Sequence, residues 1–468
     1  MLTILFISNL IFGYLQAATA TTVLNVHQYG AVANDGKDDT AAFQKAVDKL
    51  ASLHGGKLEI PAGEYCISHV KFFGKRYSNI EISGSKAIIR QTTPNLRKSV
   101  HNGIFKTYAE RYSADGCFVF DAQVSNQKDD SQSIKNIAIS GLTFISDVEK
   151  KGFDELSHQI SAHGVSNFSV SDCRFIGFLG DGIAINGGTD FRFFQDAYNK
   201  DVVIKNCAFD GVNNDNRQGI SIYYSDGFLI DNCTFKNTTR KDMPGAIDIE
   251  PDRDNNVVKN GIILNCKFEN IGGLGAVTIR TKTPSALNQY SQKNFEVSNC
   301  DFRSVVAPVA IIGTEDYTKI SPNIINVRIK NLTVDNSQNV IKIIHAYGVY
   351  IEDSSFKNIF NEDAAPITEG ESNNIIFKNC TFQNIAHPKG LYFGANTKNI
   401  SVVESVFTDF AKDAITFEYS KGIGTITNNS FVSNRSKGTF LSREEIFSTG
   451  LPSSALIKNN RVGRGVKR

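Results

Sequence analysis

A four-residue phrase, Asn-Cys-x-Phe, recurs along this chain. The complete copies begin at Asn206, Asn232, Asn265, Asn299 and Asn379. The Cys and the Phe of each copy are two residues apart, so in a β-strand their side chains point to the same side. A phrase that returns at this interval is typical of a solenoid, in which each copy forms one turn and stacks on the next. We therefore expect the Cys and Phe side chains to line the buried side of stacked turns.

Short apolar segments flank each copy, such as Asp201–Lys205 before the first copy and Gly219–Ile222 after it. Gly, Asn and Asp separate these segments and no long helical period follows residue 54, which excludes a doubly wound α/β sheet. The pattern predicts an all-β fold, a single-stranded parallel β-helix with like residues stacked inside. The Asn of each phrase is expected to form a second ladder at a bend, where its side chain bonds backbone groups.

One amphipathic helix is predicted near the N-terminus. Apolar residues recur at helical spacing after Thr40, and Gly55-Gly56 ends the pattern. These apolar residues are Phe43, Ala46, Val47 and Leu50. The open end of a β-helix exposes strand edges and core, so we expect this helix to be an N-terminal cap.

The start of the chain resembles an export signal. Leu2–Leu15 is mostly apolar but too short to span a bilayer, and Ala18-Thr19-Ala20 is a small-x-small cleavage pattern. We expect residues 1–20 to be a signal peptide and the protein to be secreted or periplasmic, without a membrane span. Residues 21–468 then form one β-helix domain, with a cap at about 21–75, loop-elaborated turns at about 140–330 and bare turns at about 331–468.

The net charge and the positions of the cysteines limit which partners, disulfides and metal sites we expect. The net charge of +2 argues against nucleic acid as a partner. Six of the eight cysteines take the inward repeat position, so we expect free thiols in the core, while the pairing of Cys66 and Cys117 stays open. No zinc-binding spacing is present and no metal site or required cofactor is predicted. The oligomeric state, a monomer or a β-helix trimer, stays open as well.

The repeat spacing directs the search for a site. The interval is 26–34 residues up to Leu332 and 22–26 residues beyond it, counted on the sequence. The longer turns carry extra loop, and loops on a rigid scaffold are where binding residues gather. Within residues 150–320, we align the second strand of each turn. This alignment places the outward side chains of successive turns in columns, spaced about 4.8 Å per turn. The first column is Ala184, Ser221, Asp248, Thr278; the second is Asn186, Tyr223, Glu250, Arg280; the third is Gly188, Ser225, Asp252, Lys282.

Two carboxylates on this face suit glycosidic bond cleavage. Asp248 and Glu250 are two residues apart, with Cα atoms about 6.6 Å apart on one side of a strand. Arg280 lies next to Glu250 in its column, whereas Asp248 has no cation in its own column. The hypothesis is a hydrolase with Asp248 as general acid and Glu250 as base or nucleophile. Its expected substrate-binding residues are Arg217, Gln218, Tyr223, Arg280, Lys282 and Asp252.

Three other interpretations stay open. On a uronate polymer, Arg280 or Lys282 would neutralise the sugar carboxylate and Tyr223 would move a proton, which gives a lyase or a C5-epimerase. Ca²⁺ could then bind Glu250, Asp252 and Asp254. A second possibility is a structural charge ladder in which the acids only neutralise the bases. A third is a non-catalytic β-helix, an adhesin or a tailspike-like protein that binds polysaccharide.

The N-terminal segment resembles a known superfamily. Tyr29-Gly30-Ala31-Val32, the run Asp35–Thr40 and the run Gly55–Tyr65 look like the start of pectate-lyase-like proteins. That group contains polygalacturonase-related hydrolases, lyases, epimerases and phage tailspikes. The resemblance implies a right-handed parallel β-helix with an N-terminal capping helix, and it says little about the reaction.

A weaker resemblance lies in the turns that carry the columns. Gly180–Ile185, Gln218–Ile222 and Arg280-Thr281-Lys282 are similar to the polygalacturonase series of an acid pair, Gly-His-Gly and Arg-x-Lys. Only Asp181 stands where that series has two acids, and Arg217-Gln218 replaces the Gly-His pair. The resemblance thus implies a catalytic role for Asp181 and binding roles for Arg280 and Lys282. His158 and His163 are interpreted as flanking a loop, Ser157–Gly164, where they either overhang the groove or, as the favoured interpretation, have no role.

Overall fold

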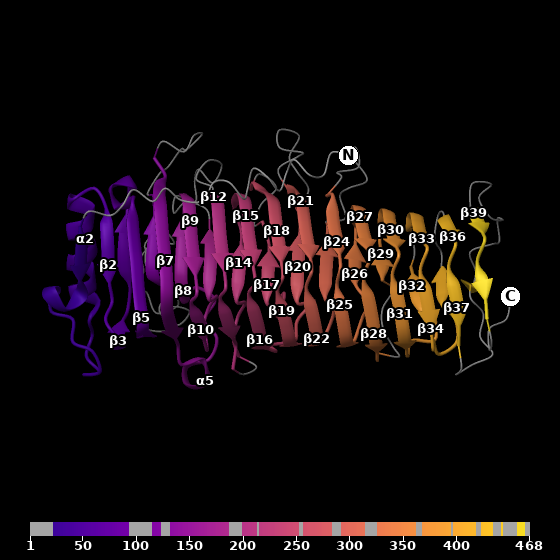
Figure 1. The fold of residues 1–468 in the computed structure, drawn as a ribbon, viewed down its shortest axis with the longest axis horizontal. Coiled ribbons are helices and arrows are strands. Elements are labelled where there is room, and N and C mark those ends of the chain that lie inside the picture. The colour runs from indigo at the N-terminus through magenta and orange to yellow at the C-terminus, as the bar shows by residue number, and fades with distance from the viewer. Residues whose placement is uncertain are drawn as a thin grey trace.

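The computed structural model is an elongated parallel β-helix capped at its N-terminal end (Figure 1). It describes residues 22–92, 115–122, 132–186, 199–212, 215–251, 256–282, 292–313, 325–361, 367–394, 396–417, 423–433, 441–442 and 456–463. The predicted signal peptide lies outside these residues. Among the described residues, no helix is long and apolar enough to cross a membrane.

The described strands form two sheets, called here sheet A and sheet B. Sheet A consists of two adjacent stacks joined by the long strands β5 (Ile80–Gln91) and β7 (Ile134–Ile145), which run through both. The first stack also contains β1 (Val23–Asn25), β2 (Gly56–Glu59), β9 (Val165–Ser171), β12 (Asn199–Lys205), β15 (Ser225–Asp231), β18 (Val258–Leu264), β21 (Gln292–Ser298), β24 (Val327–Lys330), β27 (Tyr347–Glu352), β30 (Asn373–Lys378), β33 (Lys398–Val403), β36 (Ile423–Thr427) and β39 (Leu456–Lys458).

The second stack of sheet A follows a bend in each turn of the chain. It contains β3 (Gly63–Ile67), β10 (Arg174–Ile176), β13 (Ala208–Asp210), β16 (Thr234–Thr238), β19 (Lys267–Ile271), β22 (Asp301–Val305), β25 (Thr333–Ser337), β28 (Ser355–Ile359), β31 (Thr381–Ile385), β34 (Val406–Thr408), β37 (Ser430–Val432) and β40 (Arg461–Val462). Each of these strands pairs in parallel with its equivalent in the next turn, as in β13 with β16.

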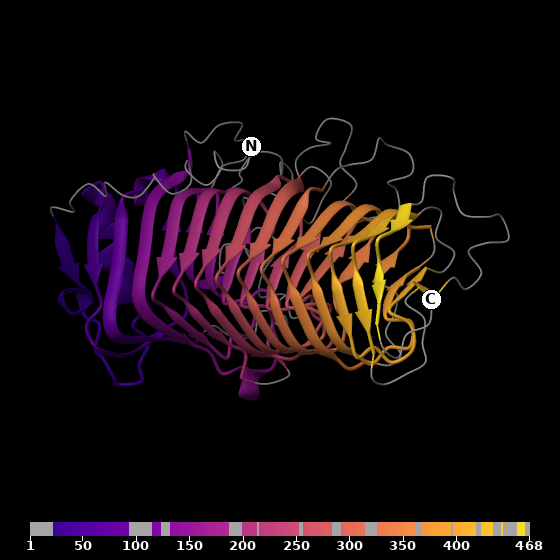
Figure 2. The same ribbon diagram turned by 45° about the vertical axis from the view of Figure 1, so that its right-hand side comes forward.

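Sheet B closes the third side of the helix. It contains β4 (Val70–Phe73), β6 (Gly116–Asp121), β8 (His158–His163), β11 (Ile183–Asn186), β14 (Ile220–Ile222), β17 (Ile247–Ile249), β20 (Val277–Arg280), β23 (Val309–Ile312), β26 (Lys342–Ile344), β29 (Thr368–Glu369), β32 (Leu391–Phe393), β35 (Ile415–Phe417) and β38 (Leu441–Ser442). Figure 2 shows the three sides wrapped around one interior that runs along the whole axis.

The interior is stacked like on like, as the repeat predicts. Along the second stack, Phe209, Phe235 and Phe268 lie in parallel with ring centroids 4.8 and 4.9 Å apart. All eight cysteines are buried and free, including Cys66 and Cys117. Burial raises the pKa of Cys380 to about 12, which keeps that thiol protonated.

The Asn ladder exists, but its partners differ from the prediction. The side-chain amide of Asn232 donates to Oδ1 of Asn206 (2.9 Å), and that of Asn206 donates to Asp172 (3.1 Å). The ladder therefore joins side chains of successive turns instead of bonding backbone groups. Asn206 has φ of 54°, and Asn tolerates this left-handed conformation better than most residues. The sharp bend and the amide ladder thus select the same residue type.

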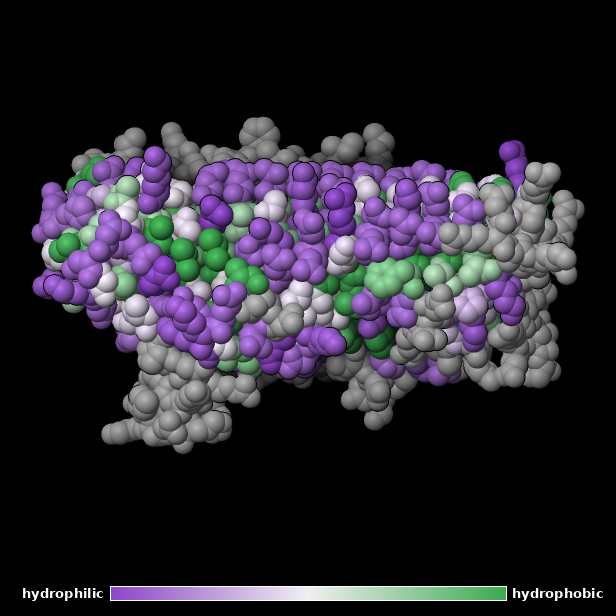
Figure 3. Space-filling model, turned by 90° about the horizontal axis from the view of Figure 1, so that it is seen from below, coloured by the Kyte–Doolittle hydropathy of each residue, from purple (hydrophilic) through white to green (hydrophobic). Residues whose placement is uncertain are grey.

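The predicted helix is α2 (Thr40–Ser52), and it covers the N-terminal end of the solenoid (Figure 1). Its buried face includes Phe43, Val47 and Leu50, as expected. Three short helices, η1 (Val26–Tyr29), η2 (Lys75–Tyr77) and α5 (Val148–Lys151), lie outside the strand stacks. Seen from below, the surface is mostly hydrophilic with an interrupted hydrophobic band along the axis (Figure 3).

The Phe stack is expected to carry much of the stability of the central turns. Phe235 is 1% exposed between two parallel rings, whereas Phe360 is 48% exposed. Phe235→Ala should lower the free energy of unfolding by about 3–5 kcal/mol, because it leaves a cavity in a packed column. Phe360→Ala should change it by less than about 0.5 kcal/mol. Denaturant unfolding of both variants checks this, and equal losses would contradict the stacked core.

Candidate active site

The outward columns predicted from the sequence lie on sheet B. Ser221 pairs with Ala184 on one side and with Asp248 on the other, and Asp248 pairs with Thr278. The second column continues the same ladder, because the backbone N–H of Glu250 donates to the carbonyl of Ile222 (3.1 Å). The register of the first two columns is therefore confirmed.

The first column is enclosed, which the sequence analysis missed. Ser221, Asp248 and Thr278 point away from the interior of the helix, yet each is 0% exposed. The turns that lead into sheet B fold over them: the hydroxyl of Thr278 donates to the carbonyl of Pro244 (2.8 Å), and Nε2 of Gln218 donates to Asp248 (3.2 Å). The expectation of an open outward face is wrong for this column.

Asp248 is a buried carboxyl group. Gln218 donates to its Oδ2, and no donor among the described residues reaches Oδ1. Burial raises the pKa of Asp248 well above its ordinary value of 3.8, and the nearby charge of Glu250 and a hydrogen bond with it raise the pKa further. Arg280 and Arg217 oppose the shift without cancelling it. This shift favours the protonated form of Asp248.

Glu250 lies beside Asp248 but has different surroundings. Nη1 of Arg280 donates to Oε1 of Glu250 (2.7 Å), and the two side chains are 21% and 31% exposed. The charge of Glu250 is among the causes that raise the pKa of Asp248, so the two carboxyl groups interact. Asp248 in β17 and Glu250, which directly follows that strand, are called here the carboxyl pair.

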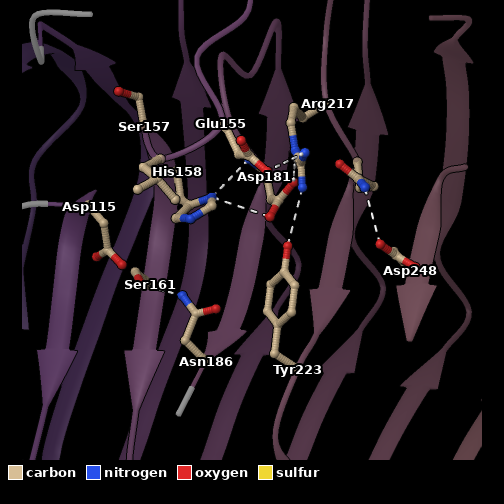
Figure 4. Close-up of polar contacts among 12 residues, drawn as sticks. Asp115, Glu155, Ser157, His158, Ser161, Asp181, Asn186, Arg217, Tyr223 and Asp248 are labelled. Carbon is tan, nitrogen blue, oxygen red and sulfur yellow. Dashed lines mark hydrogen bonds and ion pairs between the residues drawn. The ribbon is translucent and has the colours of Figure 1, made fainter. Parts of the chain in front are cut away.

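A second cluster surrounds Arg217, which precedes β14. Its Nε donates to Oδ1 of Asp181 (3.2 Å), its Nη2 donates to the hydroxyl of Tyr223 (3.2 Å), and its Nη1 contacts Glu155 (3.3 Å). Asp181 is 0% exposed and the Arg217 side chain is 12% exposed. Figure 4 shows these groups converging from three neighbouring turns. Arg217 and Asp181 are thus brought together from neighbouring turns.

Two contributors were missed by the sequence analysis. His158 lies in β8, is 2% exposed and places Nδ1 3.3 Å from Oδ2 of Asp181, so its interpretation as a loop residue is wrong. Phe153 lies under the Arg240 guanidinium, 3.5 Å from the ring centroid, with Arg217 at 5.9 Å. The segment 158–163 alternates weakly in polarity, and no sequence signal marked it as a strand of sheet B.

His163 belongs to a separate buried cluster at the other end of β8. Its Nε2 lies 3.0 Å from Oδ2 of Asp115 and 2.9 Å from Oγ of Ser161. The side-chain amide of Asn186, a member of the second column, donates to the same Ser161 oxygen (3.2 Å). Like His158, His163 is therefore a strand residue, and its interpretation as a loop residue is also wrong.

The predicted third column is not formed as expected. Ser225 starts β15 in sheet A, where it pairs with Asn199 and Val258 instead of lying on sheet B. The chain bends directly after Tyr223 and enters sheet A, so no sheet B position remains for Ser225. Lys282 follows β20, and its backbone N–H donates to Gln292 (2.7 Å). Gly188 and the candidate ligands Asp252 and Asp254 lie outside the described residues.

The site offers oxygen-rich groups but no assembled metal cage in the part of the chain that is described. No group of three or more His, Cys, Asp or Glu side chains there is arranged to hold a metal ion. Among the described residues, the carboxyl pair offers a buried carboxyl group beside a second one, and the Arg217 cluster offers a carboxylate bonded to a guanidinium.

Comparison with known proteins agrees with this geometry. Residues 23–267 match the family model described as rhamnogalacturonase A/epimerase, pectate lyase-like, and residues 321–466 match a right-handed β-helix region. The chain belongs to this pectate lyase-like family. The right-handed β-helix implied by the N-terminal resemblance is thereby confirmed.

One curated relative is the plasmin and fibronectin-binding protein A of Streptococcus pneumoniae, 25% identical over 430 residues. The match covers 89% of this chain and 51% of the relative, so the chain spans about half the length of that protein. Among solved structures, the similarity to bacteriophage phi29 gene product 12 covers 94% of this chain and 55% of the phage chain, with a TM-score of 0.63 and 14% sequence identity. The similarity to the A-module of the mannuronan C-5 epimerase AlgE6 from Azotobacter vinelandii covers 94% of this chain and 99% of that module, with a TM-score of 0.51 and 12% sequence identity. These structural likenesses show the fold alone.

The raised pKa of Asp248 can be tested by measuring the stability of the protein as a function of pH. The folded protein binds the Asp248 proton more tightly than the unfolded chain, so stability present at acid pH is lost as pH rises towards the folded pKa. The loss is about 1.4 kcal/mol per pH unit within that window. Asp248→Asn keeps an acceptor for Gln218 and lacks this loss. We expect its melting temperature to exceed that of the wild type at neutral and alkaline pH, with the gap closing towards pH about 4.

A control variant removes a partly exposed carboxylate elsewhere, whose surroundings differ from the buried site of Asp248. Glu296, which is 21% exposed and bonded to Lys330 at 3.0 Å, lies on sheet A. The melting temperature of Glu296→Gln should decline with rising pH in parallel with that of the wild type. The same parallel decline in Asp248→Asn would mean that Asp248 is not protonated in the fold.

Proposed function

We propose that the protein is an enzyme that cleaves glycosidic bonds of a polysaccharide by hydrolysis. The observation that carries this proposal is the protonated, buried Asp248 in contact with Glu250, which Arg280 holds at the rim. Acid catalysis of this kind needs a carboxyl group that keeps its proton at the working pH. Membership of the pectate lyase-like family supports carbohydrate chemistry on this face.

The carboxyl pair supplies the acid. Glu250 is the more exposed member, so it contacts the glycosidic oxygen, and Asp248 behind it holds the proton. Protonation of the leaving oxygen leaves the pair with one more negative charge, which Arg280 stabilises at a distance of 2.7 Å. This refines the sequence hypothesis: the two groups act together on one side of the bond and do not flank it.

Asp181 is the carboxylate that activates water. It precedes β11 and Asp248 lies in β17, two turns further along the axis. At about 4.8 Å per turn the two centres are about 9–10 Å apart along the axis, near the upper end of the range for inverting glycosidases. We therefore expect hydrolysis with inversion. Arg217, Gln218, Tyr223 and Lys282 are the proposed substrate contacts, together with Arg280.

A second candidate function is β-elimination or epimerisation on a uronate polymer. The hydroxyl of Tyr223 accepts a hydrogen bond from Arg217, which favours a tyrosine that exchanges a proton with a sugar. Non-catalytic binding is the third candidate, because the curated relative is named for binding plasmin and fibronectin. The protein is proposed to act outside the cell in all three cases.

One screen separates these candidates. Purified protein is incubated with pectins, alginate, glycosaminoglycans and algal polysaccharides, and the products are followed by reducing ends, ultraviolet absorbance and proton NMR. Hydrolysis predicts new reducing ends without absorbance, and the first anomer formed should be inverted. Absorbance of an unsaturated uronide would identify elimination. Binding without any product across the panel would contradict an enzyme.

Variants then assign the carboxylates. Asp248→Asn, Glu250→Gln and Asp181→Asn should each reduce kcat by at least about a hundredfold, because each removes a proton-transfer group. Glu296→Gln is the matched control for Glu250→Gln and should retain wild-type kcat. Glu296 is as exposed as Glu250 and forms a similar ion pair, but it lies on sheet A. Near-normal activity in both Asp248→Asn and Glu250→Gln would exclude the carboxyl pair as the acid.

A further inference from the structure

His158 makes two contacts with the same residue. The backbone N–H of Asp181 donates to Nδ1 of His158 (3.0 Å), and Oδ2 of Asp181 lies 3.3 Å from the same nitrogen. A ring nitrogen that accepts the amide proton carries no proton of its own, so His158 is the tautomer protonated at Nε2. The short Nδ1–Oδ2 distance is therefore a contact between two acceptors and not an ion pair.

The second oxygen of Asp181 is held without a donor. Oδ1 accepts from Arg217, whereas no donor among the described residues reaches Oδ2, which is buried. A buried acceptor left in this state costs free energy relative to a bonded one. Oδ2 instead faces Nδ1 of His158, which already accepts from the backbone amide of the same residue.

The backbone of His158 is held on both sides and the neighbouring turn leaves room for its ring. Nε2 of Gln91 donates to the carbonyl of His158 (2.9 Å), and the N–H of His158 donates to the carbonyl of Asp115 (2.9 Å). Gly180 leaves the space for the ring, because a Cβ at that position would lie 3.0 Å from Nδ1 of His158. Figure 4 shows the ring directed at Asp181 from the neighbouring strand.

We propose that His158 is the positioning residue for Asp181: its Nδ1 accepts the hydrogen bond of the Asp181 backbone amide and thereby fixes the carboxylate that Arg217 bonds. The proposal rests on the proposed function, in which Asp181 is the base. The step balances: water loses a proton to the Asp181 carboxylate as its oxygen bonds the sugar carbon, the bond between that carbon and the glycosidic oxygen breaks, and the leaving oxygen takes the proton of the carboxyl pair.

The test compares two substitutions at position 158. His158→Asn keeps an acceptor near the place of Nδ1, whereas His158→Ala keeps none. We expect kcat of His158→Ala to fall by about tenfold to a hundredfold with KM within about twofold, because a small displacement of a reacting group is costly. His158→Asn should recover most of kcat. Equal loss of kcat in both variants would overturn the acceptor role.

A second measurement needs no substrate. Hydrogen–deuterium exchange at the Asp181 amide should become faster in His158→Ala and stay close to wild type in His158→Asn. His163→Ala is the matched control, since His163 also forms a buried His–Asp pair in β8 but contacts Asp115 instead of Asp181. It should lower the melting temperature and leave exchange at Asp181 unchanged.

The two measurements separate this proposal from the proposed function. Unchanged exchange at Asp181 in His158→Ala would overturn the positioning role even if the protein is an active hydrolase. Faster exchange at the Asp181 amide in His158→Ala, with no hydrolysis of any polysaccharide by the wild-type protein, would support the positioning role of His158. The same result would contradict the proposal that the protein is a hydrolase.

Discussion

In-register stacking of parallel strands is the constraint on which the rest of this structure depends. Each turn lies about 4.8 Å from the next, so every side chain meets its equivalent in the neighbouring turns. Inside, this brings Phe235 against Phe209 and Phe268 in parallel rings. At the bend it brings Asn232 against Asn206. On sheet B the same stacking assembles a site from residues that are about thirty positions apart in the chain.

Register was predictable from the sequence because the repeat marks it. Once Asn-Cys-x-Phe had been aligned, the pairing of Ser221 with Asp248 followed, as did the contact of Glu250 with Arg280. Enclosure was not predictable, because it depends on the turns that precede each strand. Periodicity says which way Asp248 points, but only the path of the turn carrying Gln218 decides what covers it. The same limit applies to Ser225, whose sheet depends on where the chain bends after Tyr223.

Burial and ion pairing divide the acids of the site into different roles. Asp248 is enclosed without a cation in its column, which favours the neutral form, whereas Glu250 is only partly buried and is bonded to Arg280. Asp181 is enclosed as well, but Arg217 bonds one of its oxygens and His158 faces the other. His158 could not be assigned from the sequence, since neither the repeat nor a motif connects it to Asp181. The contact arises because β8 and β11 are neighbours in sheet B.

The central claim is that one carboxyl group of this site stays protonated at neutral pH because it is buried beside a second one. Infrared difference spectroscopy measures this directly through the carbonyl stretch of a protonated carboxyl group. The account predicts such a band in the wild type at neutral pH, its loss in Asp248→Asn and its retention in Glu296→Gln. A wild-type spectrum without the band, or a band that survives in Asp248→Asn, would contradict the account.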